Sequence, residues 1–418
     1  MRIIVLFACL LLPLYAFWFT SSSPKKVELQ APILDTTYEE TMAHSYLNTL
    51  RKKAGISAFH NNNNLNQAAR NHAKYLVTNH EIGHLETPQK PYYTGRTPKT
   101  RVLKTAYNTG LITENISVNA QNYKDAIDGL FSAIYHRFGF LNFRNDEIGI
   151  GVYQNTEDTN LNAFVFDMGI YTLNNLCKKK SYSGSKRYVY KVCKESRFRI
   201  EKSLFQKALT FQKSISKQII IYPYHNQTKI PTAFYKETPD PMPDYEVSGF
   251  PVSIQFNDYF FNDVQLNSFK LYDHYGKPVK GKILTPKNDP NQRFEKGQFA
   301  FFPYHRLAYG EKYTAVVNYD ANGQTSIKRW SFYTKALKKP FFVIKNVPTT
   351  IHIKPHTRYQ IYFVPKDPHD LLENLHFPAN VYVNFLDQNT ISLELLSDNS
   401  DTFTLKGEKP LLKITVDR

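Results

Sequence analysis

The sequence predicts an α+β protein in which a helix-rich N-terminal unit precedes two strand-rich units. Before residue 140, apolar residues recur every three to four positions in three segments, which is the period of amphipathic helices. After Gln218 the pattern changes to short runs that alternate apolar and polar residues, as β-strands do. The 418 residues are 42% apolar and 15% aromatic, which supplies packed cores for several domains and excludes a mainly disordered chain.

An apolar run from Ile3 to Phe19 follows the basic Arg2 at the start of the chain. A run of this size is typical of a secretory signal, and it is also at the lower limit for a membrane-spanning helix. A cleaved signal and a retained anchor within residues 1–26 therefore both stay open. In either form we expect export, to the periplasm, to the medium or to the cell envelope, and the retained form would keep the chain close to a membrane.

Three helices are expected in the N-terminal unit. The first carries its apolar stripe from Tyr38 to Leu50 and ends at Gly55, a residue type that favours helix C-termini. The asparagines at 61–64 supply a cap for the second helix, whose apolar face covers residues 65–76. The third is expected from about Tyr123 to Phe138.

Two β-like runs, 147–153 and 162–168, follow these helices. Helices followed by strands favour a layered α/β unit over residues 37–173. Residues 174–217 are basic and partly helical, and we interpret them as a connector.

The rest of the chain is predicted to be strand-rich. Short strands fill residues 218–335, where Asn322-Gly323 is a strong hairpin signal. Strands at this spacing predict an immunoglobulin-like β-sandwich. Lys338-Lys339-Pro340 then breaks the pattern, and residues 341–418 are expected to form a small third β domain.

The formal net charge is +17, from 53 basic and 36 acidic residues. This balance suits lipid headgroups, acidic glycans or nucleic acid without choosing among them. Export and the lack of a nucleic-acid-binding motif count against nucleic acid. In an exported chain Cys177 and Cys193 are expected to form a disulfide around a basic loop, with two free buried thiols as the alternative.

The segment His80-Glu81-Ile82-Gly83-His84 matches the letters of the zinc-protease motif H-E-x-x-H. That motif works because two histidines one helical turn apart bind the metal while the glutamate activates a water. Here Gly83 separates the histidines, Pro88 follows, and the second helix should end near Asn79. We therefore interpret the match mainly as chance.

A second candidate site combines His84 with Glu114 and with His136, which precedes Arg137. Each of the three side chains is expected in or beside irregular backbone near the end of a helix. Such positions can converge on one cleft. One charged residue in a loop would not indicate a site, but three such residues together do.

An ordered set of short motifs runs through the N-terminal unit. It comprises Tyr46-Leu47-Asn48, Arg51-Lys52-Lys53-Ala54-Gly55, Leu65-Asn66-Gln67-Ala68-Ala69-Arg70-Asn71-His72-Ala73, His84, Tyr93-Thr94-Gly95-Arg96-Thr97-Pro98, Arg101, Glu114-Asn115-Ile116, His136-Arg137 and Glu147-Ile148-Gly149-Ile150-Gly151. With these motifs, residues 40–170 resemble the CAP superfamily of cysteine-rich secretory, antigen 5 and pathogenesis-related proteins, in the bacterial SCP-like form.

The resemblance implies an α-β-α sandwich with a cleft that commonly holds two histidines and two acids. By this resemblance His84 and His136 are the histidines and Glu114 is one acid. The family's second acid sits three residues after a tryptophan, whose place is taken here by Leu130, so the acid position falls on Ala133. The remaining side chains could hold zinc or another divalent ion, or form a polar pocket without metal.

The resemblance also implies binding of lipid, sterol or a partner protein, with hydrolase activity proposed in places. We expect an envelope-associated binding protein whose partner is a lipid, an anionic envelope component, a glycan or a protein. The alternative is a metal-dependent hydrolase, using either His80, Glu81 and His84 or the cleft side chains. The sequence contains no recognisable nucleophile–base pair, which favours binding.

Overall fold

The computed structural model describes residues 32–398, 402–407 and 410–417. The expected signal or anchor in residues 1–26 lies outside the described residues. Within the described ranges, no helix combines the length and the apolar character needed to cross a membrane.

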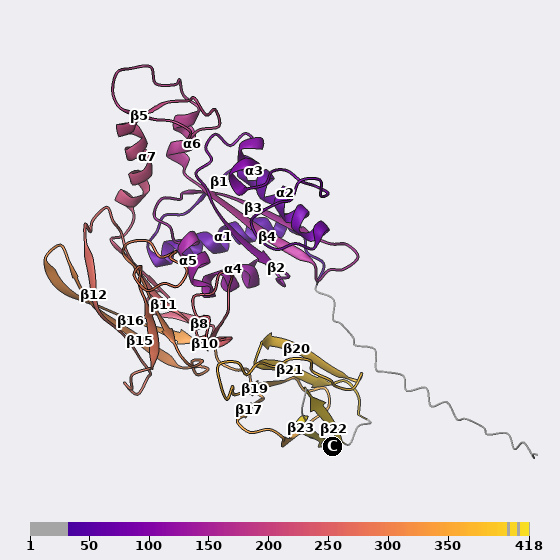
Figure 1. The fold of residues 1–418 in the computed structure, drawn as a ribbon. Helices are drawn as coiled ribbons and strands as arrows, with labels where there is room; N and C mark the ends of the chain where they lie inside the picture. The colour runs from indigo at the N-terminus through magenta and orange to yellow at the C-terminus, as the bar shows by residue number, and fades with distance from the viewer. Residues whose placement is uncertain (1–31, 399–401, 408–409, 418) are drawn as a thin grey trace, which may run out of the picture.

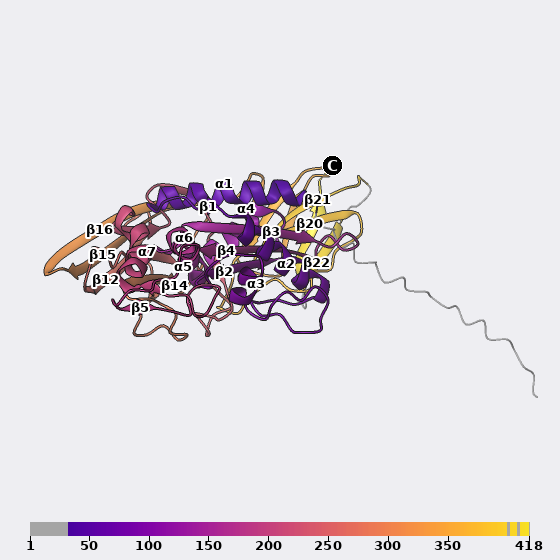
Figure 2. The ribbon, with the colours of Figure 1, turned by 90° about the horizontal axis from the view of Figure 1, so that it is seen from above.

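The N-terminal part has three layers around a mixed four-stranded sheet of order β1-β3-β4-β2, with β2 at one edge. In Figure 2 α1 lies on one side of this sheet, and α2 and α3 lie on the other. The elements are α1 (Thr36–Ala54), β1 (His60–Asn61), α2 (Asn63–Asn79), α3 (Pro98–Lys104), β2 (Thr113–Val118), α4 (Tyr123–Ser132), α5 (Ile134–Phe140), β3 (Glu147–Gln154) and β4 (Asn162–Gly169).

Strand β3 explains why both helical layers approach the sheet closely. Ile148 and Ile150 face the core shared with α1 and α4. The alternating Gly149 and Gly151 face α2, where an added Cβ would lie 2.0 Å from backbone atoms of that helix. The alternation of isoleucine and glycine therefore sets the spacing between α2 and the sheet.

Local sequence signals place the ends of the first two helices as expected. Asn62 is the N-cap of α2 and accepts hydrogen bonds from the amides of Asn64 and Leu65. Gly55 ends α1 in the left-handed region at φ 106°. These features confirm the predicted N-terminal cap of α2 and the predicted end of α1 at Gly55.

The predicted third helix is wrong as one element, because it breaks at Ala133. That residue has extended backbone angles (φ −76°, ψ 117°) between α4 and α5. The amide of Ile134 donates to Glu237 Oε1 at 2.6 Å instead of to a helical carbonyl. The backbone around Glu114 also differs from the expected loop, since it forms edge strand β2.

Downstream, two four-stranded sheets of orders β13-β14-β11-β7 and β12-β15-β16-β8 share one apolar core. The predicted hairpin is confirmed, with Asn322 and Gly323 at φ 50° and 78° between β15 and β16. The strands are β7 (Ile219–Tyr222), β8 (Gln227–Ile230), β9 (Ala233–Tyr235), β10 (Val247–Gly249), β11 (Val252–Phe256), β12 (Val264–Tyr272), β13 (Gly281–Leu284), β14 (Gln298–Pro303), β15 (Lys312–Ala321) and β16 (Gln324–Thr334).

The C-terminal part has its own apolar core between sheets of orders β17-β19-β21-β20 and β18-β23-β22. It lies at the opposite end of the molecule from α7 in Figure 1. Its strands are β17 (Phe341–Ile344), β18 (Thr349–Ile353), β19 (Tyr359–Phe363), β20 (Val381–Asp387), β21 (Thr390–Leu395), β22 (Thr402–Lys406) and β23 (Pro410–Val416). The molecule is thus α+β with a strand-rich C-terminal region; the exact domain boundaries stay predictions.

The connector forms a small lobe of α6 (Tyr171–Cys177), β5 (Tyr188–Val189), β6 (Ile200–Glu201) and α7 (Lys202–Ile215) at the top of Figure 1. The predicted disulfide between Cys177 and Cys193 is confirmed, with the two Cα atoms 5.4 Å apart. It closes the basic loop onto the lobe's apolar cluster.

Candidate functional site

Two of the predicted cleft residues meet at the edge of the central sheet. His84, in the loop after α2, places Nδ1 2.8 Å from Oε1 of Glu114, which lies on β2. The carboxylate is 1% exposed whereas the imidazole is 47% exposed. A buried anion therefore holds a histidine whose other ring edge reaches solvent.

Arg101 of α3 supplies the second partner of this carboxylate. Its Nη2 lies 2.6 Å from Glu114 Oε2, and its Nη1 donates to the carbonyl of His84 at 3.0 Å. Burial opposes ionisation of Glu114, but the hydrogen bonds from His84 and Arg101 and the electrostatic influence of the neighbouring His72 and Arg101 outweigh it. They lower the Glu114 pKa to about 2, so the group is a carboxylate at neutral pH.

A second buried acid, Asp167 on β4, stands directly opposite Glu114 in the β2–β4 register. Neither carboxyl oxygen of Asp167 receives a hydrogen bond from an N–H or O–H group of the described residues. Burial and the charge of Glu114 raise the Asp167 pKa well above its ordinary value. Asp167 is therefore the neutral acid of the pair.

Sequence reasoning missed Asp167. The available signal was an acid inside the apolar strand Ala163–Met168, since an acidic residue is rarely buried without a partner.

His72 and Glu86 form a further buried pair beneath the loop that carries His84. His72 Nδ1 lies 2.9 Å from Glu86 Oε1, and its Nε2 lies 3.0 Å from the carbonyl of Gly83. Burial opposes ionisation of Glu86, but hydrogen bonds from His72 and from the amides of Thr94 and Gly95 lower its pKa. The pair thus fixes the backbone on both sides of His84.

The third predicted cleft residue, His136 on α5, has a different partner. Its Nδ1 lies 2.9 Å from Oε2 of Glu237, and the two side chains are 18% and 4% exposed. Its carbonyl accepts a hydrogen bond at 2.8 Å from Asn115, the neighbour of Glu114. Within the described chain, His136 makes no hydrogen bond or ion pair with His84 or Glu114, so Asn115 is the link between the two histidine segments.

Glu237 is the second residue that sequence reasoning missed. Its Oε1 accepts the amide of Ile134, beside the Ala133 position that lacks the expected acid. The acid next to His136 therefore comes from the strand-rich region, 101 residues further along the chain. No local pattern could have indicated it.

Arg137 is a structural support rather than a cleft residue. Its side chain is fully buried, and it donates to the carbonyl oxygens of Phe131 at 2.6 Å and Pro251 at 2.7 Å. It therefore joins α4 and α5 to the strand-rich region.

The zinc-protease interpretation of residues 80–84 is wrong in its geometry. Helix α2 ends at Asn79, and His80 is a left-handed C-cap at φ 52°, so His80 and His84 share no helix face. Glu81 accepts a hydrogen bond from Tyr75 at 2.6 Å and pairs with Lys90. Because the helix stops too early, the motif cannot present two ligands one turn apart.

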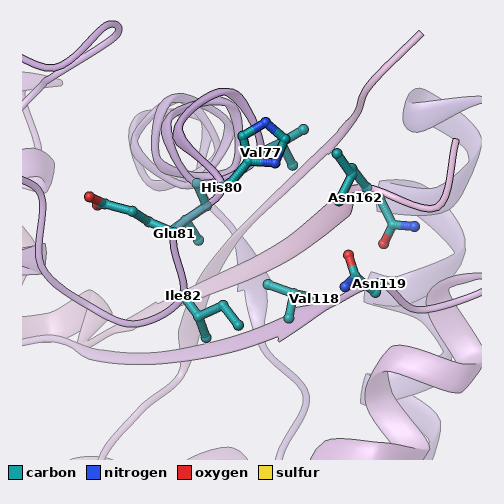
Figure 3. Close-up of a pocket in the computed structure, with 9 residues that line it drawn as sticks. Val77, His80, Glu81, Ile82, Val118, Asn119 and Asn162 are labelled. Carbon is teal, nitrogen blue, oxygen red and sulfur yellow. The ribbon is translucent and has the colours of Figure 1, made fainter. Parts of the chain in front are cut away.

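Residues 80–82 instead border a small pocket of about 110 Å³ that does not include His84 or Glu114 (Figure 3). Ile82 points toward Val118 across it, while Glu81 points away from it. The lining residues are Leu76, Val77, His80, Glu81, Ile82, Val118, Asn119, Leu161 and Asn162.

The side chains present do not fit the divalent metal that the resemblance raised. In the described part of the chain, no group of three or more His, Cys, Asp or Glu side chains is placed to hold a metal ion. Both oxygens of Glu114 are already engaged by His84 and Arg101. Nε2 of His84 and Nε2 of His136 make no hydrogen bond to the described residues, so the chemistry open to the site is hydrogen bonding through these two atoms.

A model of the cysteine-rich secretory protein family (CAP) matches residues 44–168. No curated protein matches the sequence significantly.

Among solved structures, an outer surface protein from Borrelia burgdorferi aligns at 23% identity and a TM-score of 0.29, over 32% of this chain and 95% of that one. An extracellular SCP-domain protein from Bacillus anthracis aligns at 19% identity and a TM-score of 0.28, over 32% of this chain and 44% of that one. A cysteine-rich secretory protein from Staphylococcus aureus aligns at 17% identity and a TM-score of 0.25, over 33% of this chain and 40% of that one.

Proposed function

Residues 44–168 of this chain form a domain of the cysteine-rich secretory protein family, and on that premise we propose that the protein is an exported, envelope-associated binding protein. Its ligand contacts are the Nε2 edges of His84 and His136. Export is supported by the apolar run from Ile3 to Phe19 and by the Cys177–Cys193 disulfide, which persists in oxidising compartments.

The observation that carries the proposal is the full engagement of both carboxylates. Glu114 accepts from His84 and Arg101, and Glu237 accepts from His136 and the amide of Ile134. With a pKa of about 2, Glu114 is a weak base, which disfavours general-base hydrolysis. The carboxylates instead orient the rings for recognition.

The orientation of the rings favours a hydroxyl-rich ligand. When Nδ1 of a neutral imidazole donates to a carboxylate, Nε2 carries the lone pair and accepts hydrogen bonds. Sugar hydroxyl groups donate such bonds, whereas lipid tails do not. We therefore propose an envelope glycan as the ligand class for this site.

The strand-rich region has one direct role in this proposal. It supplies Glu237, which orients His136. The two four-stranded sheets with a common core support an immunoglobulin-like sandwich for residues 218–335.

Calorimetric titration of the full-length protein with soluble peptidoglycan fragments tests the ligand class. His84→Ala and His136→Ala should each weaken binding about threefold to tenfold, the worth of one hydrogen bond. His352→Ala is the matched control, because His352 is also an exposed imidazole beside a carboxylate, 2.9 Å from Asp417. It should leave the affinity unchanged.

Glycan binding that is unaffected by either cleft variant would contradict the proposed site. Binding to lipid vesicles or to an envelope protein through these histidines, with no binding to the fragments, would contradict the glycan assignment.

A further inference from the structure

Residues 178–202, here called the basic arm, hold ten basic and two acidic residues, which leaves a net charge of +8 within the chain's +17. All ten basic residues are exposed. They are Lys178, Lys179, Lys180, Lys186, Arg187, Lys191, Lys194, Arg197, Arg199 and Lys202.

Almost none of this charge is neutralised by the protein itself. Among the described residues, Lys186 is the single basic residue of the arm that pairs with a carboxylate, and its Nζ lies 3.3 Å from Glu201 Oε1. An ordinary solvated surface intersperses both signs of charge. The basic arm instead presents one sign, and an anionic partner would relieve its internal repulsion.

The basic arm is held in a defined shape. The disulfide ties Cys193 within the arm to Cys177, the residue that precedes the arm, and an isolated bridge links Cys193 to Thr109. The amide of Lys194 donates to the carbonyl of Asn108 at 2.8 Å. Because the N-terminal domain anchors the arm, its charges form a surface rather than a free tail.

Aromatic side chains lie among the charges. Tyr188 is 41% exposed and Tyr190 is 55% exposed. The Arg199 guanidinium lies 4.5 Å from the Tyr188 ring centre, and Lys191 Nζ lies 5.5 Å from that of Tyr190. Tyrosine next to basic residues is a composition typical of membrane–water interfaces.

Helix α7, which starts where the arm ends, adds an unpartnered apolar stripe. Ala208 and Gln212 face the protein, whereas Leu204, Phe211 and Ile215 are 43%, 50% and 58% exposed. The exposed three follow one another at spacings of seven and four residues, so they share one side of the helix, along the margin of the face that Ala208 and Gln212 bury. A helix with an outward apolar face beside basic residues is typical of lipid interfaces.

We propose that the basic arm and the outward stripe of α7 form a docking surface for an anionic lipid bilayer. Lysine and arginine contact the anionic headgroups, while Tyr188, Tyr190 and the α7 stripe lie at the boundary with the acyl chains. The apolar stripe favours a bilayer over a soluble polyanion. A polyanion would neutralise the charges but would leave Leu204, Phe211 and Ile215 in water. This surface shares no residue with the proposed ligand contacts of His84 and His136, and it does not depend on their ligand.

Tryptic cleavage after Arg187 in the full-length protein tests the surface, because Arg187 lies within the basic arm. Binding of the N-terminal segment to a vesicle would not by itself shield this site. Vesicles of equimolar phosphatidylglycerol and phosphatidylcholine should slow this cleavage about tenfold, and vesicles of phosphatidylcholine alone should not. Lys178→Glu, Lys179→Glu and Lys180→Glu together reverse three charges of the arm. They should weaken the affinity for anionic vesicles, measured from the vesicle concentration that slows cleavage, about a hundredfold or more. The protein with Leu204→Ser, Phe211→Ser and Ile215→Ser should also lose protection.

The matched control reverses three exposed lysines that flank β17, in the C-terminal part of the chain, with Lys338→Glu, Lys339→Glu and Lys345→Glu. Because its net charge equals that of the arm variant, retained protection in this control assigns the effect to the arm. Equal losses in both charge variants would overturn the proposal. Protection by soluble polyphosphate as strong as by anionic vesicles, or unchanged protection in the α7 variant, would also overturn it, in favour of a polyanion partner.

Discussion

Glu114 and Asp167 form a buried carboxyl pair across strands β2 and β4, in which Glu114 is ionised and Asp167 keeps its proton. Arg101 and His84 hold the charge on Glu114, and burial together with that charge keeps Asp167 neutral. The pair places one negative charge, not two, behind the exposed His84. It makes the stability of the fold depend on pH in two opposite ways.

The raised pKa of Asp167 should make the protein less stable as pH rises. The native state keeps a proton that the unfolded chain releases above about pH 4, so the free energy of unfolding falls until the pH passes the native pKa. Asp167→Asn should flatten this fall, because an amide, like the protonated acid, carries no charge and does not ionise in this pH range. Urea unfolding between about pH 5 and pH 9 measures the difference.

Asp263→Asn is the control for this prediction, because the Asp263 side chain is exposed. This substitution should leave the pH dependence of the unfolding free energy the same as in the parent protein. A parent protein whose unfolding free energy is flat over the same pH range would contradict a neutral Asp167.

Glu114 should give the opposite dependence at acid pH. Its pKa is about 2 against an ordinary 4.5, so its stabilisation is present above about pH 4.5 and is lost as the pH falls toward 2. Arg101→Met removes a buried partner and should cost about 3–5 kcal/mol at neutral pH. The acid loss should become smaller, because the native pKa of Glu114 then lies nearer to its ordinary value.

Arg144→Met is the matched control, since Arg144 pairs with Glu295 at 2.9 Å on the surface. It should cost less than about 1 kcal/mol. Similar losses from the two variants, measured by urea unfolding near pH 7, would count against a strongly stabilising buried ion pair between Arg101 and Glu114.

Local chemistry made much of the fold predictable from the sequence. The asparagine cap before α2, the stop at Gly55 and the Asn322-Gly323 hairpin depend on residues only a few positions apart. The disulfide was predictable because Cys177 and Cys193 are the two cysteines outside the N-terminal apolar run, and the sequence led us to expect export.

The candidate site was predictable only in part, because its partners come together through the tertiary fold. The ordered motifs identified His84 and Glu114, which do meet. They also identified His136, but its partner Glu237 comes from a different unit of the chain. Asp167 faces Glu114 through strand register, which no local pattern in β4 reveals.

Breaking the His136–Glu237 pair should loosen the junction between α5 and the strand-rich region. Glu237→Ala leaves the amide of Ile134 and Nδ1 of His136 without their acceptor, and should lower the unfolding free energy by about 1–3 kcal/mol. Glu237→Gln keeps an acceptor and should cost less.

Hydrogen exchange provides a local readout for the Glu237 variants. The amide of Ile134 should exchange faster in Glu237→Ala than in Glu237→Gln, because only the second variant offers it an oxygen. Asp417→Asn, at the exposed pair with His352, is the control and should leave exchange at Ile134 unchanged. Equal exchange at Ile134 in both Glu237 variants would argue against this hydrogen bond.

Close contact between α2 and β3 should make Gly149 intolerant of any side chain. A Cβ there would lie 2.0 Å from the carbonyl carbon of Leu65, which is helix backbone and cannot rotate away. We expect Gly149→Ala to cost about 3 kcal/mol or more. Gly129→Ala is the matched control, because Gly129 lies in α4 with nothing within 4 Å of an added Cβ, and it should stabilise the protein by about 1 kcal/mol. Thermal unfolding of both variants decides: equal midpoints would disprove the close packing of α2 on the sheet.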